Sequence, residues 1–468
     1  MAICFLPAVE LASLLRRREL SARELTVAHL ARVERVNPSL NAIVTLTAEA
    51  AVLEAERADE AAAKGEFLGP LHGLPVLHKD LHDTRGVRTT YGSPIFRNHV
   101  PDEDALIVAR MKRAGAITLG KSNTPEFGAG SQTFNPVFGA TCNPWDVRLT
   151  CGGSSGGAAV ALACGMAALA GGSDMGGSLR NPASFCNVVG LRPSPGRVPQ
   201  LSMHSAWQTL SVDGPMGRTV ADVALALSAI AGPDPRDPIS LGAEGAMFAR
   251  PLDRDFRGVR VAWCKDLGGT VFDPGITSAV NSRRQVFEDL GCAVQEAQPD
   301  LSGADEVFRT FRAWWFELRF GGLLEEHRGR IKETVVEEIE RGRKLTGADI
   351  GRAEVLRTRL FHRVREFFDR FDFFVLPVTQ VPPFSLDEPW VKEIAGRPMT
   401  SYIDCMRSCY YISVTGCPAI SVPCAFTPEG LPVGMQIVGR HRDDWGVLQL
   451  AYAFEQATGC WKRHPNNP

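Results

Sequence analysis

The sequence predicts an α/β protein, a sheet flanked by helices, because short apolar segments alternate with segments of helical pattern. A helix over 104–113, capped by its first residue, is followed by a buried strand over 116–119. The same order recurs as a strand over 259–263, a helix over 276–290 and a strand over 292–294. Such alternation is typical of folds in which helices cover a sheet.

The first 65 residues are predicted to be helical. Ser21 and Glu24 have the spacing of a capping box, and apolar residues follow at helical intervals. A second helix, rich in alanine and glutamate, is expected over 47–64 and ends at Gly65.

The second half begins with a mainly helical region over 303–370. Its aromatic residues are better explained as a packed helix face, with a substrate pocket as the alternative; they are Phe308, Phe311, Trp314, Trp315 and Phe320. The last elements are expected to be a strand over 373–376, a Pro-rich loop over 377–389, strands over 420–423 and 434–438, and a helix over 445–457. The turn-rich stretch 232–238 is either a boundary or an ordinary surface loop.

The composition is that of an ordinary globular protein. The 468 residues are 44% hydrophobic and 22% charged, with 51 Lys and Arg against 53 Asp and Glu. This balance provides no basic field for nucleic acid or for an anionic membrane. The longest apolar run, 158–170, is too short to span a bilayer. The twelve cysteines include no CxxC pair, which favours reduced core thiols and a cytoplasmic location.

Two glycine-rich clusters, 151–157 and 173–180, carry serines that suggest acyl-transfer chemistry. Consecutive N–H groups in such turns can converge on an anion. If Ser178 is a nucleophile, its own N–H and those of Met175, Gly176 and Gly177 are suited to form an oxyanion hole. A single cluster of this kind is more often a flexible loop, so the pair carries the argument.

The first cluster also matches the Gly-x-Ser-x-Gly pattern of an α/β-hydrolase nucleophile elbow. That elbow needs an apolar strand just before the serine, whereas residues 143–150 are polar and turn-like. It also needs a later acid and histidine, for which His441 beside Asp443 and Asp444 is the candidate. A phosphate-binding loop is less favoured, because no Gly-Lys-Ser/Thr follows the glycines.

Lys79 follows a short apolar run, Leu74–His78. A lysine acts as a base near neutral pH only if burial or a cationic neighbour lowers its pKa from about 10.4. Taken alone, Lys79 is better explained as a surface lysine.

Taken together, these motifs resemble those of the amidase signature hydrolases. The resemblance covers nearly the whole chain and rests on ordered landmarks: Lys79-Asp80, 119–123, 143–146, 152–157, 176–180, 189–193 and 415–419. It implies a three-layer α/β/α sandwich around a large mixed, mostly parallel sheet. It also implies a single domain over 1–468, with N-terminal helices over 1–65, a signature core over 66–200 and a mainly helical, loop-rich insert over 303–400.

The resemblance further implies a catalytic triad without metal or cofactor. Lys79 would be the base, Ser154, on a cis peptide, the bridging serine, and Ser178 the nucleophile that forms an acyl-enzyme. Ser155 and Asp174 would support them by hydrogen bonds. The backbone near Gly128 would form part of the acyl-binding wall, and the substrate pocket is expected from 200–210 and 303–400.

The expected activity is hydrolysis of a linear carboxamide, a small molecule, to a carboxylate and ammonia or an amine. The alternatives are the glutaminase subunit of a tRNA-dependent amidotransferase, a hydrolase of ureido substrates, and a non-catalytic relative, which the presence of all three triad residues disfavours. The family is often dimeric, so a homodimer is one expected state. Three positions depart from the commonest pattern, namely Cys151, Ser173 and Asn187. Cys151 would confer sensitivity to thiol reagents if it were exposed.

Overall fold

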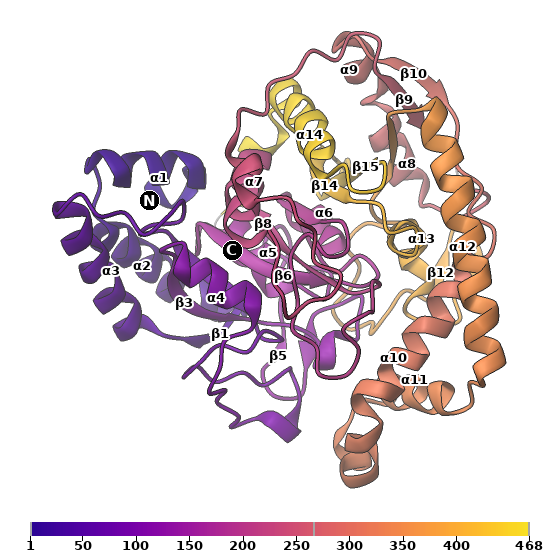
Figure 1. Cartoon of the computed structure of the whole chain (residues 1–468), viewed down its shortest axis with the longest axis horizontal. Coiled ribbons are helices and arrows are strands. Elements are labelled where there is room, and N and C mark those ends of the chain that lie inside the picture. Colours follow the sequence, from indigo (N-terminus) through magenta and orange to yellow (C-terminus); the bar gives the residue numbers. More distant parts are fainter. Residues whose placement is uncertain (1, 265–266, 467–468) are drawn as a thin grey trace.

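An eleven-stranded sheet forms the centre of the computed structural model, which describes residues 2–264 and 267–466. Its strand order is β1-β3-β2-β6-β8-β7-β14-β15-β11-β9-β10. Figure 1 shows β1 and β3 in the N-terminal half of the molecule and β9 and β10 on the opposite side. The strands are β1 (Ile43–Leu46), β2 (Pro75–Lys79), β3 (Ile117–Ser122), β6 (Leu169–Asp174), β7 (Val189–Arg192), β8 (Val212–Gly217), β9 (Arg260–Trp263), β10 (Ala293–Glu296), β11 (Phe373–Pro377), β14 (Ala419–Phe426) and β15 (Pro432–Gly439). The strands predicted near residues 116, 259, 292, 373, 420 and 434 are β3, β9, β10, β11, β14 and β15.

The sheet is mixed, as predicted. Parallel pairing occurs in two blocks, β3-β2-β6 and β11-β9-β10. The strands between these blocks, from β6 through β8, β7, β14 and β15 to β11, are paired antiparallel. The parallel part of the prediction therefore applies to neighbouring strands within these two blocks.

Helices cover both faces of the sheet, which confirms the predicted layers. Side chains alternate between faces along a strand, so residues five apart point to opposite sides. On β15, a Cβ added to Gly434 would meet Ser184 of α6 (Arg180–Cys186), whereas one added to Gly439 would meet Val447 of α14 (Asp444–Thr458). Helix α5 (Gly156–Ala163) packs beside α6, and α7 (Val220–Ile230) packs beside α14.

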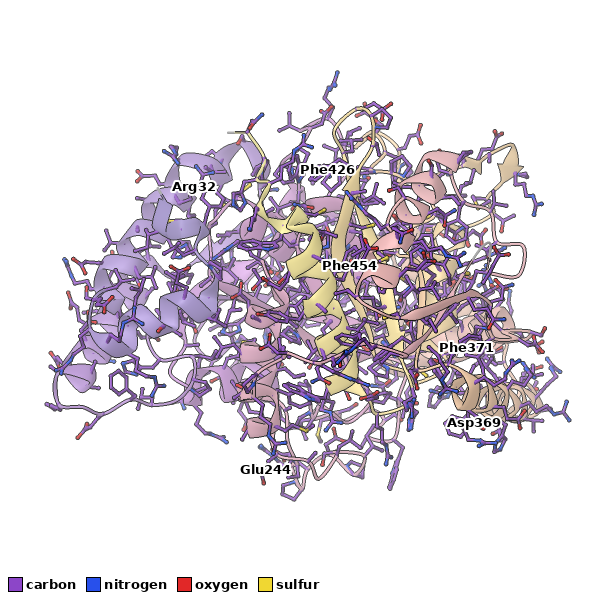
Figure 2. All side chains as sticks on the ribbon, turned by 90° about the horizontal axis from the view of Figure 1, so that it is seen from above. Arg32, Glu244, Asp369, Phe371, Phe426 and Phe454 are labelled. Atoms are coloured by element: carbon purple, nitrogen blue, oxygen red, sulfur yellow. The ribbon has the colours of Figure 1, made fainter. Side chains whose placement is uncertain are left out.

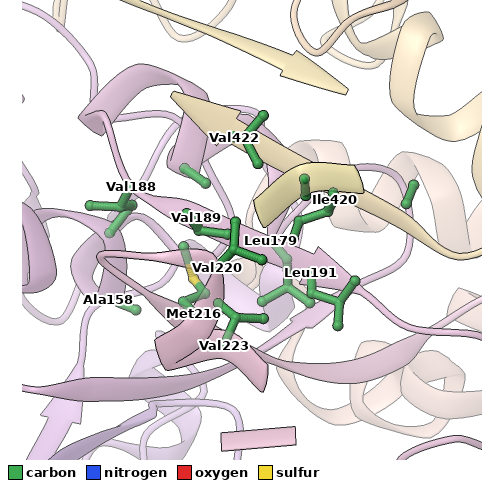
Figure 3. Close-up of a cluster of buried hydrophobic side chains, with 14 of the residues drawn as sticks. Ala158, Leu179, Val188, Val189, Leu191, Met216, Val220, Val223, Ile420 and Val422 are labelled. Atoms are coloured by element: carbon green, nitrogen blue, oxygen red, sulfur yellow. The ribbon is translucent and has the colours of Figure 1, made fainter. Parts of the chain in front are cut away.

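The central core lies between these helices and the sheet (Figure 3). Val220 and Val223 of α7 are fully buried, and so are Val189 and Leu191 of the sheet and Leu179 before α6. Burial of such side chains contributes roughly 1.5–3 kcal/mol each to folding. The core therefore holds the loop that leads from β6 into α6, next to Ser178.

The N-terminal helices are α1 (Ala8–Arg17), α2 (Ala22–Leu40), α3 (Ala48–Ala63) and α4 (Leu106–Arg113). The capping box of α2 is confirmed, since the Ser21 side chain accepts from the Glu24 N–H while Glu24 accepts from the Ser21 N–H. The predicted cap by Asp104 is wrong, because α4 begins at Leu106 and its cap position is Ala105. The Asp104 carboxylate instead accepts from the Arg85 N–H and from Lys112 Nζ, at 2.7 and 2.8 Å.

The helix predicted over 276–290 is two helices, α8 (Pro274–Asn281) and α9 (Arg284–Asp289). Ser282 lies at the break, where its hydroxyl donates to the Ala279 carbonyl oxygen at 2.7 Å. Serine and asparagine side chains compete for backbone hydrogen bonds in this way, which is why they interrupt helices.

The region predicted to be helical over 303–370 contains α10 (Ala304–His327), α11 (Glu333–Arg343) and α12 (Gly347–Arg370). Figure 2 shows that α14 runs between the N-terminal helices and α12. The labels Phe454, Arg32 and Asp369 mark these three parts of the molecule in that order. A short helix, α13 (Arg407–Ser413), precedes β14. Two small hairpins, β4–β5 (Phe134–Asn135 and Gly139–Ala140) and β12–β13 (Glu393–Ile394 and Arg397–Pro398), complete the elements. No helix in residues 2–264 or 267–466 is long and apolar enough to cross a membrane.

The cysteines predicted to lie in the core do so. Cys164, Cys186, Cys417 and Cys424 are buried free thiols, and Cys151 is buried with them. Burial raises the pKa of the Cys151 thiol well above its ordinary value. The condition for sensitivity to thiol reagents, exposure of Cys151, is therefore not met.

Candidate active site

The site forms at one edge of the parallel block β3-β2-β6. Strand β2 ends at Lys79 and strand β6 ends at Asp174, and their parallel pairing places both carboxyl ends at this edge. Loops that follow the carboxyl ends of parallel strands are the usual place for ligand sites in α/β sheets. The chain from β6 into α6 carries Ser178, and the turn before α5 carries Ser154 and Ser155.

Lys79 is fully buried and contacts two serines. Its Nζ lies 2.7 Å from Ser154 Oγ, 3.1 Å from Ser173 Oγ and 3.4 Å from the Ser173 carbonyl oxygen. Burial lowers the pKa of Lys79 to about 7, although Asp174 and Asp213 oppose the shift. The surface position expected for Lys79 from its local sequence alone is therefore wrong, because β2 is buried along its whole length.

The turn before α5 joins the two glycine-rich clusters. The Gly153–Ser154 peptide bond is cis, as the resemblance implies. The Ser155 N–H donates to the Ser178 carbonyl oxygen at 3.1 Å, and Ser155 Oγ donates to the Ser173 carbonyl oxygen at 3.4 Å. Ser154 and Ser178 line the same cleft. Two turns that are 24 residues apart in sequence thus meet at one wall.

Asp174 organises the backbone around Ser178. Its carboxylate is fully buried and accepts from the N–H groups of Gly177 and Leu179, at 2.9 and 3.1 Å. It also accepts from Arg180 at 2.9 Å and from Arg192 at 3.2 Å. Burial alone would raise the pKa of Asp174, but the two guanidinium groups hold it well below its usual range. The loop is therefore fixed by one ionised carboxylate that two buried cations share.

Three of the four backbone positions predicted near the reacting carbonyl line the cleft, namely Met175, Gly176 and Gly128. Gly177 differs, because its N–H donates to Asp174 and is not directed to the cleft. Its φ is +118°, and a Cβ there would lie 2.6 Å from Cys409 Cβ, so only glycine fits. Gly177 thus shapes the turn, and its role as an oxyanion donor stays a prediction.

The cleft encloses about 650 Å³, including the part that is open to solvent. Its far wall comes from α10 and from a segment that precedes α13. Helix α10 contributes Phe308, Arg312, Trp315, Phe316, Arg319 and Phe320, and the later segment contributes Tyr402, Ile403 and Met406. The pocket expected from 303–400 is thus found on α10. Residues 200–210, the other segment expected to form the pocket, are not among the lining residues of the described chain, but the adjacent Ser211 is.

The aromatic residues of α10 were predicted to be a packed helix face, and both interpretations apply. Phe308, Trp315 and Phe320 are almost fully buried and also line the cleft. Phe311 and Trp314 are not among the cleft-lining residues of the described chain. Phe320 packs against Phe127 with ring centroids 4.5 Å apart, so α10 is anchored to the loop that carries Gly128.

The alternative of an α/β-hydrolase triad is wrong. His441 lies in a separate depression with Phe361 and Arg440. Asp444 accepts from the Ser194 N–H at 2.7 Å and from Arg197 at 3.1 Å, and Asp443 caps α14. No strand within residues 143–155 leads into the first cluster, since that stretch consists of turns and isolated bridges.

Sequence reasoning missed two features of the site. Ser173 was noted only as a departure from the usual residue, yet its side chain and carbonyl oxygen both contact Lys79. Arg180 and Arg192 belong to quoted motifs but received no role; both side chains are fully buried against Asp174. The available signal was that Arg180 lies in the same glycine-rich cluster as Asp174, so that an ion pair between them could have been expected.

Known proteins resemble this chain in sequence over nearly its whole length. The Amidase family model matches residues 24–448. The chain belongs to the amidase signature family. It is 36% identical to an acylamidase of Rhodococcus erythropolis, over 96% of this chain and 95% of that protein. It is 37% identical to a glutamyl-tRNA(Gln) amidotransferase subunit of Moorella thermoacetica, over 99% of each.

Solved structures of the amidase signature family have the same fold. A bacterial aryl acylamidase of that family superposes with a TM-score of 0.93 at 28% identity, covering 99% of each chain. The 6-aminohexanoate cyclic dimer hydrolase in complex with its substrate gives 0.90 at 27% identity, again covering 99% of each. This amidase is accordingly a hydrolase that acts on amides.

Proposed function

We propose that this amidase cleaves a linear carboxamide to a carboxylate and ammonia or an amine, through an acyl-enzyme on Ser178. The observation that carries the proposal is the contact of a fully buried lysine with Ser154, 2.7 Å away, in the cleft that Ser178 lines. A lysine with a pKa near 7 is partly neutral at working pH and can act as a general base.

In the first half-reaction, neutral Lys79 takes the hydroxyl proton of Ser154 as Ser154 takes the proton of Ser178. Ser178 Oγ then bonds to the carbonyl carbon, and the carbonyl electron pair moves to oxygen. When the carbonyl re-forms, the C–N bond breaks. Ser154 gives its proton to the departing nitrogen and regains one from the Lys79 ammonium.

In the second half-reaction, water attacks the acyl carbon and passes its proton through Ser154 to Lys79. The carbonyl re-forms, the bond to Ser178 Oγ breaks, and the proton on Lys79 returns to Ser178 through Ser154. The carboxylic acid leaves and ionises. The triad is thus restored with no group other than water consumed.

The N–H groups of Met175, Gly176 and Ser178 are the candidates to stabilise the oxyanion. Each belongs to a residue that lines the cleft, whereas the Gly177 N–H is bonded to Asp174. Fixed donors of this kind stabilise the transition state because they need no reorganisation as charge develops. Asp174 and Ser155 support the proposal by holding this turn and the turn of Ser154 together.

A stand-alone amidase is favoured over a component of an amidotransferase. The aryl acylamidase superposes with a TM-score of 0.93, whereas a glutamyl-tRNA(Gln) amidotransferase subunit from Thermotoga maritima gives 0.76. The cleft wall on α10 is also largely aromatic, which suits a substrate with an apolar chain or aryl ring better than glutamine. Ammonia release confined to glutamine would reverse this preference, and release from ureido compounds alone would favour the ureido alternative.

Substitution of Ser178 tests the proposal. Ser178→Ala is expected to abolish release of nitroaniline from an acyl p-nitroanilide, with an unchanged circular dichroism spectrum. Ser302→Ala, which alters an exposed serine of a surface loop, is the matched control and should retain full activity. Turnover by Ser178→Ala close to that of the wild type would show that another residue is the nucleophile.

A further inference from the structure

The charges that line the cleft are unbalanced. Its ionised side chains on the far wall are Arg312 and Arg319, both on α10, and no Asp or Glu lines the cleft in the described chain. A cleft with one sign of charge attracts ligands of the other sign, because the surrounding protein focuses the field. The two arginines, however, are placed differently.

Arg312 is neutralised within the protein. Its side chain is buried, and its guanidinium lies 2.6 Å from the Glu338 carboxylate of α11 and donates to the Tyr402 hydroxyl. Its Cζ atom also lies over the Phe316 ring, 4.4 Å from the centroid. These contacts explain Arg312 as a brace between α10, α11 and the segment before α13.

Arg319 is solvent-accessible in the cleft and forms no salt bridge with any residue that the structure describes. Two acids that interact electrostatically with Arg319 already have donors. The Asp83 carboxylate accepts from the Tyr91 hydroxyl, and Asp213 accepts from His82 Nε2 at 3.1 Å. Surrounding protein lowers the pKa of Arg319, against the opposing effect of Tyr91, Asp213 and Asp83. Arg319 therefore remains a cation with donors free for a ligand.

We propose that Arg319 binds a carboxylate carried by the substrate, so that the enzyme prefers amides with an anionic group remote from the scissile bond. The inference rests on the proposed function and names its substrate class. Guanidinium donors match the two oxygens of a carboxylate in a bidentate pair.

The aromatic wall defines the rest of this substrate class. Phe308, Trp315 and Phe320 lie on the same helix as Arg319 and line the same cleft. The Arg319 guanidinium lies 5.2 Å from the centroid of the Phe320 ring. An apolar chain or aryl ring can pack on this wall while its terminal carboxylate reaches Arg319. The substrate is thus an amide with an apolar spacer that ends in a carboxylate.

Two pairs of amides test the inference, one for each side of the scissile bond. Glutaryl p-nitroanilide is compared with valeryl p-nitroanilide, and N-acetyl-4-aminobenzoate with acetanilide. The wild type is expected to show a higher kcat/KM for the carboxylate in at least one pair. Arg319→Gln should reduce that ratio by about tenfold, which is the usual effect of a lost charge-assisted hydrogen bond. Arg319→Lys should retain part of the ratio, because it keeps the charge.

Arg328→Gln, which removes an exposed arginine just after α10, is the matched control and should leave the ratio unchanged. Added salt should lower the ratio of the wild type but not that of Arg319→Gln. A ratio that is the same in wild type and Arg319→Gln for both pairs would overturn the inference. Activity in Ser178→Ala would instead overturn the proposed function, so the two failures are distinguishable.

Discussion

At the scale of single residues, Lys79 shows how burial changes the chemistry of a side chain. A lysine in water is protonated at pH 7 and is a poor base. The interior lowers the pKa of Lys79 to about 7 by removing water from the charged form. Asp174 and Asp213 oppose this shift. Burial thus gives a basic amine at a position that looks like a surface lysine in the sequence.

The activity should therefore depend on the protonation of Lys79. We expect kcat/KM for a neutral anilide to rise with pH and to level off above about pH 7, as Lys79 becomes neutral. Lys79→Ala should lose about 10²–10⁴-fold in kcat/KM at neutral pH, the usual contribution of a general base. Lys64→Ala, at the exposed end of α3, is the control. A wild-type pH profile in Lys79→Ala would require another base.

Loss of the Asp174 carboxylate should destabilise the fold, although Asp174 is not one of the proposed triad residues. In Asp174→Asn, the guanidinium groups of Arg180 and Arg192 stay buried without their counter-charge. We expect the free energy of unfolding to fall by about 3–5 kcal/mol, as measured by urea denaturation. Asp255→Asn breaks an exposed pair with Arg257 and should cause no measurable change. Equal effects of the two substitutions would contradict this account.

At the scale of elements, α5 shows why the first cluster needs its glycines. The helix begins against the neighbouring backbone, so a Cβ on Gly157 would lie 2.3 Å from the Asn123 nitrogen and 2.4 Å from the Ala42 carbonyl oxygen. Backbone atoms cannot move aside as a flexible side chain can. The close approach places the turn of Ser154 beside Lys79.

Two glycine substitutions in helices test this point. Gly157→Ala should lower the free energy of unfolding by about 1–3 kcal/mol through overpacking and should reduce activity by displacing Ser154. Gly351→Ala, in the interior of α12 with no atom within 4 Å of the added Cβ, should instead stabilise by about 0.5–1 kcal/mol. Thermal and urea unfolding of both variants measure the difference. Equal shifts would show that crowding at Gly157 is unimportant.

At the scale of the whole molecule, the cleft brings together segments that are distant in the sequence. Lys79 and Ser154 are 75 residues apart, Asp174 is held by Arg180 and Arg192, and the far wall comes from α10 and the segment before α13. Burial of an amine at this junction is a cost to the fold as a whole.

The stability of the fold should accordingly depend on pH through Lys79. The folded pKa of about 7 lies below the ordinary value of 10.5, so between these values the unfolded chain binds one proton more. Between about pH 7 and 10.5, the free energy of unfolding of the wild type therefore rises with pH by up to about 1.4 kcal/mol per pH unit. This gain in stability is lost as the pH falls through 7. Lys79→Met has no titrating amine at this position. By urea denaturation, the free energy of unfolding of Lys79→Met relative to that of the wild type should be greater at about pH 6 than at about pH 9. The same relative stability at both pH values would contradict a buried amine with a lowered pKa.

By itself, the sequence determined what depends on neighbours along the chain. The alternation of apolar and helical segments predicted the α/β class and most strands, and Ser21 with Glu24 predicted the start of α2. The resemblance of its ordered motifs to those of the amidase signature hydrolases was sufficient to name Lys79, Ser154 and Ser178 as a candidate triad. Local periodicity and capping carry the information on helices and strands, because they involve residues only a few positions apart.

Only the tertiary structure decided the properties that depend on distant contacts. These are the neutral state available to Lys79, the pairing of Asp174 with two arginines, the bonded N–H of Gly177 and the unpaired cation of Arg319. Each depends on burial or on a distance between segments that local pattern does not encode. The sequence thus named candidate reacting groups, whereas packing set their charges, their hydrogen-bond donors and the wall of the cleft.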